Sequence, residues 1–144
     1  MAVYLDSSAL VKFVVAEAES EALRRFIRRR TDRVSSVLAR LEVLRAVRMH
    51  GAPAIERAKK VLARIHLLHI DDEVLESASV LPPGVLRSLD AIHLASARAL
   101  GEDLECVVTY DRRMSEAAVL LSLSVRSPGT RDDRPGRRHA RKPR

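Results

Sequence analysis

The spacing of apolar residues along the chain predicts short strands that alternate with amphipathic helices. Leu23, Phe26 and Ile27, for example, recur at the three- and four-residue intervals of a single helix face. Strands at residues 2–6, 105–109 and elsewhere alternate with such helices, which indicates right-handed crossovers and a parallel arrangement. The sequence therefore predicts an α/β fold, in which a small, mostly parallel sheet is covered by helices.

The predicted elements follow one another closely along the chain. The strands are expected at residues 2–6, 33–35, 67–70, 105–109 and 121–125. Helices are expected from residue 7 or 8, over residues 18–30, 36–50 and 54–65, from residue 71 or 72, and over residues 88–100 and 112–118.

Breaks in the pattern divide the chain into one domain and a tail. Residues 51–53 and 82–84 combine Gly with Pro and interrupt the helical periodicity, as is usual between elements of one domain. From Ser127 onward, Gly, Pro and Arg replace the apolar pattern, and such a segment buries too little surface to offset its ordering entropy. We therefore expect a folded domain over residues 1–126 and a basic, disordered tail over residues 127–144.

The composition restricts the classes of function. Hydrophobic residues make up 47% of the chain, which is enough for a core, but aromatic residues make up only 3%, so few side chains can stack on nucleic-acid bases. The single cysteine, Cys106, excludes an internal disulfide and favours a reducing, cytoplasmic location. The longest apolar runs fall far short of the ~18 residues that a membrane span needs, so we expect no association with a membrane.

Positive charge is concentrated in two places. The chain has a formal net charge of +7, and residues 127–144 hold seven Arg or Lys against two Asp. A second group of arginines lies near the end of the helix predicted over residues 18–30. Basic surfaces of this kind favour partners that carry phosphates. Within the domain, the candidates for holding phosphates are Lys12, Arg24, Arg25, Arg28, Arg29, Arg30, Arg112 and Arg113.

Four carboxylates stand where apolar neighbours make a charge costly. Asp6 ends the first predicted strand and Asp111 follows the fourth, whereas Glu42 and Asp90 interrupt apolar helical stretches. Ligands gather at the carboxyl ends of parallel strands in such folds. If all four acids face one point, each close pair repels by roughly 4 kcal/mol at ~4 Å. A divalent cation with oxygen ligands, Mg²⁺ or Mn²⁺, would offset this repulsion.

Each of these acids also has a purely structural explanation. Asp6 and Asp111 precede predicted helices and can cap them, and Asp90 lies near a helix N-terminus, where the helix dipole favours an acid. Glu42 can form an ion pair with Arg45 on the same helix. One shared metal site explains all four acids together, and we favour it over four separate structural explanations.

Small hydroxyl residues accompany the first and the last of the acids. Ser7 and Ser8 follow the first acid directly, and Thr109 lies two residues before the last. Such hydroxyls can orient a carboxylate or hold a metal-bound water. For Ser7 we expect ordinary cap or turn chemistry instead. His93, one helical turn after the third acid, is a candidate for an indirect role at the site.

The acids lie within four short motifs. These are Tyr-Leu-Asp-Ser-Ser-Ala-Leu-Val-Lys at residues 4–12, Leu-Glu-Val at 41–43, Leu-Asp-Ala-Ile-His-Leu-Ala at 89–95 and Val-Thr-Tyr-Asp-Arg-Arg at 108–113. Taken in this order over residues 2–125, they resemble the motifs of PIN-domain ribonucleases, specifically the VapC-type toxins of type II toxin–antitoxin systems.

The resemblance implies a PIN-like three-layer α/β/α fold, Mg²⁺ or Mn²⁺ as cofactor and RNA as substrate. It also implies a cognate antitoxin protein as partner and a homodimer. It assigns metal binding and catalysis to Asp6, Glu42, Asp90 and Asp111, with the first and third as the principal ligands. We therefore expect a metal-dependent endoribonuclease that hydrolyses RNA phosphodiester bonds as the toxin of a toxin–antitoxin pair.

Other functions compete with this interpretation. A protein of the same fold that binds a partner without catalysis is disfavoured by the intact acids at all four positions, and an RNA-binding protein without catalysis would depend on residues 127–144 rather than on Asp90. A phosphatase with an aspartate nucleophile is disfavoured, because such enzymes carry a second Asp two residues after the first, where this chain has Ser8.

Overall fold

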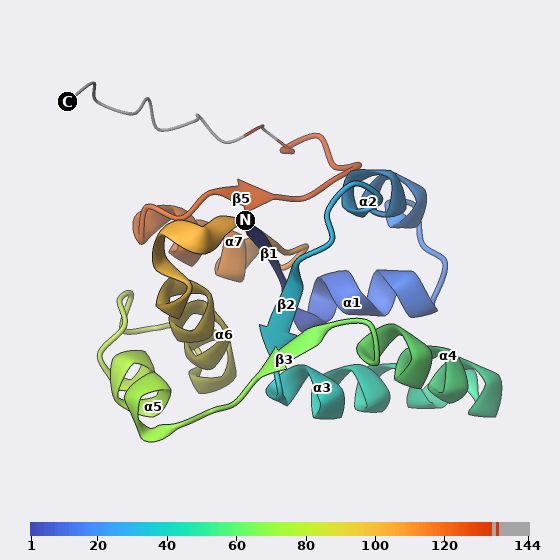
Figure 1. Ribbon diagram of the computed structural model, residues 1–144, viewed down its shortest axis with the longest axis horizontal. Helices are drawn as coiled ribbons and strands as arrows, with labels where there is room; N and C mark the ends of the chain where they lie inside the picture. The colour runs from blue at the N-terminus through green and yellow to red at the C-terminus, as the bar shows by residue number, and fades with distance from the viewer. Residues whose placement is uncertain (134, 136–144) are drawn as a thin grey trace.

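A five-stranded sheet with the strand order β3-β2-β1-β4-β5 forms the centre of the molecule (Figure 1). This computed structural model describes residues 1–133 and 135. All neighbouring strands pair in parallel, which confirms the predicted α/β class. The strands are β1 (Ala2–Leu5), β2 (Arg33–Ser36), β3 (His66–Leu68), β4 (Leu104–Val108) and β5 (Val125–Arg126).

Helices cover both faces of this sheet, as the three-layer prediction requires. The helices α1, α3 and α4 contact one another on one face, whereas α5 and α7 contact α6 on the other (Figure 1). The α-helices are α1 (Ser7–Val14), α2 (Ser20–Ile27), α3 (Leu38–Val47), α4 (Ala52–Leu62), α5 (Asp72–Ser79), α6 (Ser88–Ala99) and α7 (Arg112–Leu120), and the short 3₁₀ helices are η1 (Arg48–His50) and η2 (Gly101–Asp103).

Alternate residues of β1 enter the cores on the two sides of the sheet. Val3 and Leu5 pack with Leu10 of α1 in one cluster, whereas Tyr4 packs with Ala97 of α6 in the other. All of these side chains are buried. Because the side-chain period of a strand is two, every residue of β1 is buried, and the strand reads as a continuous apolar run.

The connection after β1 determines where a site can form. The chain leads from β1 to β2 and β3 on one side, and then crosses to β4, which pairs with β1 on its other side. Strand order therefore reverses between β1 and β4, and ligands bind at the carboxyl ends of the strands at such a point. The carboxyl ends of β1 and β4 are joined directly, since the amide of Asp6 donates a 3.2 Å hydrogen bond to the carbonyl of Val108.

The predicted last edge strand is present as β5, but its predicted bounds of residues 121–125 are wrong. The helix α7 continues to Leu120, and the chain then turns through Ser122, whose φ is 60°. The amide of Leu123 donates to the carbonyl of Ala118 and so closes the helix end. Leucines near residue 121 thus pack in the core after a helix, and the strand β5 contains only Val125–Arg126.

The first residues beyond the predicted domain boundary are packed against the domain. Asp133 accepts hydrogen bonds from the Arg126 guanidinium at 2.9 and 3.0 Å, and Tyr110 donates to the carbonyl of Pro128 at 2.8 Å. Ser127 donates to the Thr109 carbonyl at 2.6 Å. The predicted disordered tail therefore does not begin at residue 127. The remainder of that prediction, residues 134 and 136–144, lies outside the described residues.

The longest of the helices in the described part of the chain, α6, contains 12 residues. Within residues 1–133 and 135, none of them is both long enough and apolar enough to cross a membrane.

Candidate active site

Asp6 lies at the carboxyl end of β1 and caps the helix that follows. Its Oδ1 accepts hydrogen bonds from the Ala9 amide at 3.0 Å and from the Ser8 hydroxyl at 2.6 Å. Its Oδ2 accepts a 2.5 Å hydrogen bond from the Thr109 hydroxyl, at the end of β4. The capping role predicted for Asp6 is confirmed, and the hydroxyls of Ser8 and Thr109 orient the carboxylate as predicted.

The charge of Asp6 is poorly compensated. The side chain is only 3% exposed, and burial raises its pKa above the ordinary value, although the Ser8 and Thr109 hydroxyls oppose this. Its hydrogen-bond partners are hydroxyls and an amide, and no ion pair joins it to another of the described residues. A buried carboxylate without a counter-ion fits a site for a cation.

Glu42 projects from α3 and is held by residues from two other elements. Its Oε1 accepts hydrogen bonds from the Ser7 hydroxyl and from His93 Nε2, each at 2.6 Å. Burial tends to raise the pKa of Glu42, but the hydrogen bonds from His93 and Ser7 outweigh it and lower the pKa below its ordinary value. The expectation of only cap or turn chemistry for Ser7 is wrong, because its hydroxyl orients Glu42.

A buried chain of hydrogen bonds defines the orientation of His93. The Tyr4 hydroxyl lies 2.8 Å from His93 Nδ1, and the imidazole is 2% exposed. Burial raises the pKa of Tyr4 far above its ordinary value, so the phenol keeps its proton and can donate it to Nδ1. With Nδ1 facing the Tyr4 hydroxyl, Nε2 of the same ring faces Glu42 Oε1 at 2.6 Å. The indirect role predicted for His93 is thereby given a structural basis.

Asp90 and Asp111 share one cation, the guanidinium of Arg87. The Arg87 Nε lies 3.0 Å from Asp90 Oδ2, and an Nη of the same group lies 3.5 Å from Asp111 Oδ2. Asp90 stands in the first turn of α6, and Asp111 caps α7 by accepting from the Met114 amide at 3.0 Å. The structure therefore confirms the predicted helix-terminal positions of both acids.

Three of the four acids, Asp6, Asp90 and Asp111, are linked by intermediate residues. Thr109 joins two of them, because its hydroxyl donates to Asp6 and accepts from the Asp111 amide at 3.1 Å. In the part of the chain that the structure describes, no group of three or more His, Cys, Asp or Glu side chains is arranged as a metal centre. Instead, Glu42 contacts His93, whereas Asp90 and Asp111 contact Arg87.

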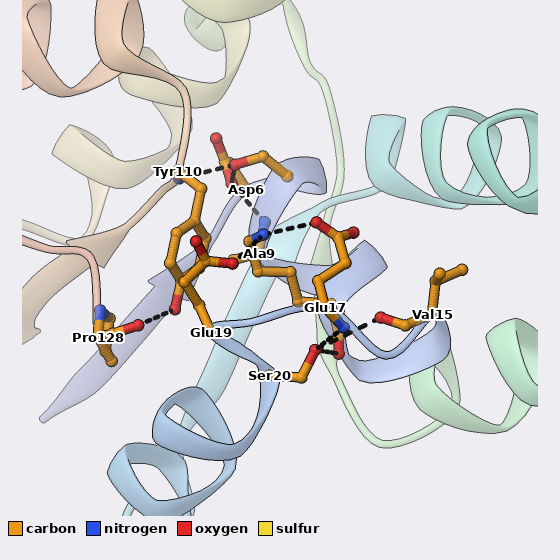
Figure 2. A network of polar contacts seen from close by, with 10 residues as sticks. Asp6, Ala9, Val15, Glu17, Glu19, Ser20, Tyr110 and Pro128 are labelled. Carbon is orange, nitrogen blue, oxygen red and sulfur yellow. Dashed lines mark hydrogen bonds and ion pairs between the residues drawn. The ribbon is translucent and has the colours of Figure 1, made fainter. Parts of the chain in front are cut away.

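Lys12 is not free to hold phosphates, contrary to its selection from the sequence. Its ammonium group lies 2.8 Å from Glu17 and 2.9 Å from Glu19, and 4.6 Å from the centre of the Tyr110 ring. Figure 2 shows this network extending from Asp6 past Tyr110 to Pro128. Lys12 is therefore a buried structural cation beside the site.

Arg30, which follows α2, lies at the other end of the sheet. Arg30 pairs with Glu105, the second residue of β4, at 2.7 Å, and packs over the ring of Phe26. The amino end of β4 is remote from the carboxyl ends of β1 and β4, where Asp6 and Asp111 lie. Arg30 is therefore engaged with Glu105 away from the acidic site, and phosphate contact by the other arginines of residues 24–30 stays a prediction.

Two residues of the site were not selected from the sequence, namely Arg87 and Tyr4. The position of Arg87 carries a weak signal, because a cation three residues before an acid at a helix N-terminus opposes the helix dipole. Tyr4 carries no such signal. Its contact with His93 joins residues 89 positions apart, and in the sequence the tyrosine is one more residue of an apolar strand.

Comparison with known proteins establishes the family. Residues 3–120 match the PIN domain. The chain belongs to the PIN-domain family. It is 52% identical over 127 residues to Ribonuclease VapC46 of Mycobacterium tuberculosis, a match that covers 88% of this chain and 98% of that protein. It is 42% identical over 131 residues to Ribonuclease VapC35 of the same organism, with coverage of 88% and 97%. The resemblance to VapC-type proteins seen in the motifs is confirmed over most of the chain.

Solved structures show the same fold. VapC20 of Mycobacterium tuberculosis, a toxin that cleaves the sarcin–ricin loop, superposes with a TM-score of 0.67 at 16% identity, covering 81% of this chain and 95% of that one. A toxin–antitoxin complex from Klebsiella pneumoniae superposes with a TM-score of 0.60 at 18% identity, covering 77% and 87%. The predicted PIN-like α/β/α fold is confirmed. Ribonucleases of this family generally need a divalent metal ion, and the oxygen-rich set of side chains described above fits one.

Proposed function

We propose that this PIN-domain protein is a metal-dependent endoribonuclease that acts as the toxin of a toxin–antitoxin pair. The observation that supports this most directly is the buried carboxylate of Asp6 at the junction of β1 and β4, which has no counter-ion among the described residues. Asp111, the N-cap of α7, is connected to Asp6 through the Thr109 hydroxyl, whereas Glu42 and Asp90 are carried by α3 and α6. The relatives that share up to 52% of this sequence are named ribonucleases.

The four carboxylates would hold Mg²⁺ or Mn²⁺. Asp6 and Asp90 are the principal ligands in this proposal, and Glu42 and Asp111 complete the set. A bound divalent ion supplies a more acidic water and stabilises charge on the oxygens of the phosphodiester. The other residues maintain the geometry: Ser8 and Thr109 orient Asp6, whereas Ser7 and His93 orient Glu42 and keep it ionised.

Contact with the RNA backbone would come from cations at the start of α7. Arg113 is exposed in the first turn of this helix, beside Asp111. Arg112 is less available, because it pairs with Glu116 on its own helix at 3.0 Å. The N-terminus of α7 also favours anions through its dipole. We therefore propose Arg113 as a phosphate contact.

The proposed partners follow from the family. A cognate antitoxin protein would block the acidic site, in keeping with the structural likeness to a toxin–antitoxin complex. The exposed apolar side chains Leu41, on α3, and Met49, on η1, offer surface for a homodimer. Cleavage of cellular RNA would place the protein in the cytoplasm.

The proposal is tested by incubating the purified protein with RNA in the presence of Mg²⁺, Mn²⁺ or EDTA. We expect cleavage with either metal and none with EDTA. Asp90→Asn should reduce the rate by more than ~100-fold, because even indirect partners of metal ligands are worth about 10–100-fold.

The control is Asp72→Asn, which removes an exposed carboxylate from the first turn of α5 without touching the site. It should retain the wild-type rate. Equal cleavage by Asp90→Asn and wild type would indicate a contaminating nuclease and refute the assignment. Binding of RNA without cleavage, lost on removal of residues 127–144, would favour the alternative of a binding protein.

A further inference from the structure

Arg87 is tethered to the site almost entirely by the two acids that it joins. It occupies the N-cap position of α6 with an extended backbone (φ −67°, ψ 149°), and its side chain makes no capping hydrogen bond. The described contacts of its guanidinium are those to Asp90 Oδ2 at 3.0 Å and to Asp111 Oδ2 at 3.5 Å. The side chain is 62% exposed, so it can swing away without disturbing the core.

This arrangement opposes the local electrostatics of the helix. The N-terminus of α6 carries a partial positive charge, which repels an arginine and attracts a carboxylate. The attraction of Asp90 and Asp111 therefore accounts for the position of the guanidinium. Conversely, the single positive charge of the guanidinium offsets part of the repulsion between these two carboxylates.

We infer that Arg87 is an internal cation that competes with the divalent metal ion for Asp90 and Asp111. This inference rests on the proposed function, in which the same two carboxylates are metal ligands. While Arg87 is in place, its positive charge lies beside both Oδ2 atoms and opposes the approach of a second cation. Arg87 thus holds the pair of acids together in the metal-free protein and has to leave when the metal ion binds.

The expected change in metal affinity follows from the exposure of the Arg87 side chain in its ion pairs with Asp90 and Asp111. Ion pairs of this kind are weak in water, and two of them shift a competing equilibrium by about 3–10-fold. Removal of the guanidinium should therefore tighten metal binding by about 3–10-fold. A lysine at the same position keeps the charge but loses the planar fork that spans two carboxylates, so its effect should be intermediate.

The experiment measures the affinity of the full chain for Mn²⁺ from the electron paramagnetic resonance signal of free Mn²⁺, without RNA. We compare wild type with Arg87→Gln, Arg87→Lys, Asp90→Asn and Arg112→Gln. The last variant is a matched control, because Arg112 is 91% exposed, lies next to Asp111 in sequence and pairs with Glu116 instead of with the site. Circular dichroism verifies that each variant is folded.

We expect the dissociation constant of Arg87→Gln to fall by about 3–10-fold, that of Arg112→Gln to change less than about twofold, and that of Asp90→Asn to rise. An unchanged or weaker affinity in Arg87→Gln, with binding lost in Asp90→Asn, would overturn the competition and leave the proposed metal site standing. An equal gain in Mn²⁺ affinity in Arg112→Gln and Arg87→Gln would show that the loss of any nearby positive charge is sufficient. That outcome would also overturn the competition by Arg87. Unaltered binding in Asp90→Asn would refute the metal site and, with it, the role of Arg87.

Discussion

The carboxylate of Asp6 is a charge that the metal-free protein stabilises poorly. Three hydrogen-bond donors surround it, namely the Ala9 amide and the hydroxyls of Ser8 and Thr109. Burial nevertheless outweighs these donors and raises the pKa of Asp6. The residue that is best placed to bind a cation is therefore also a source of instability when the cation is absent.

We predict that Asp6→Asn stabilises the metal-free protein. Asparagine has nearly the same shape, its carbonyl can accept from Ala9 and Ser8, and its amide can donate to the Thr109 hydroxyl. Since the substitution removes a buried charge, the free energy of unfolding in EDTA should rise by on the order of 1 kcal/mol or more at neutral pH. Urea unfolding monitored by circular dichroism measures this change.

The gain in stability from Asp6→Asn should be larger at neutral pH than at acidic pH. The folded pKa of Asp6 lies above the unfolded value, so ionised Asp6 lowers stability at neutral pH, and this cost fades as the pH falls toward about 4. The advantage of Asp6→Asn should shrink accordingly. Asp71→Asn is the control, because Asp71 is an exposed N-cap that Asn replaces without loss. A gain of equal size in both variants would contradict the explanation by burial.

Helix termini position several of the functional side chains, and one glycine controls the turn between two of these helices. Gly51 ends η1 and precedes α4, with φ 85° and ψ 179°. This region of backbone conformation is essentially restricted to glycine. Both α3, which carries Glu42, and α4 pack against α1, so the turn at Gly51 determines how this helical layer is assembled.

We predict that Gly51→Ala destabilises the protein by about 1–3 kcal/mol, the usual cost of forcing a residue with a Cβ into this conformation. Thermal or urea unfolding measures the loss. Gly84→Ala is the matched control, because Gly84 does not have a positive φ and a Cβ there would meet no atom within 4 Å. Equal stability of the two variants would show that the strain at Gly51 is relieved elsewhere.

At the scale of the whole molecule, the segment of residues 127–133 crosses from β5 toward α2 and packs against the domain (Figure 1). A Cβ at Gly129 would lie 2.9 Å from Ala22 Cβ, so the segment approaches α2 closely enough to require glycine. Its contact with Tyr110 lies next to Asp111 in the sequence. The segment therefore belongs to the folded domain and supports the loop that leads to the site.

Truncation after residue 126 should therefore destabilise the protein. It removes the Asp133 carboxylate from Arg126 and the hydrogen-bond partner of the Tyr110 hydroxyl. We expect a loss of about 1–3 kcal/mol relative to a chain that ends at residue 135, which retains these contacts. The chain of residues 1–135 is the matched control. Equal urea midpoints for the two truncations would show that residues 127–133 contribute nothing to stability.

Local patterns in the sequence predict the order of the secondary-structure elements and the acids of the candidate site. The apolar periodicity predicts the order of strands and helices, because the face of an element depends on residues a few positions apart. The carboxyl ends of parallel strands point to Asp6 and Asp111, and isolated charges in apolar helices point to Glu42 and Asp90. The motifs around these four acids resemble those of the PIN family, and the family comparison confirms the resemblance.

Other features depend on residues that only folding brings together. The hydrogen bond between Tyr4 and His93 and the pairing of Arg87 with Asp111 join positions 89 and 24 residues apart. The wrong bounds predicted for the last strand and the unpredicted packing of residues 127–133 also result from contacts between residues that are distant in the sequence. Which neighbours a side chain meets depends on strand order and helix packing, and the local spacing of residues contains no information about either. The sequence thus reveals which acids are unusual, and the fold determines which residues hold them.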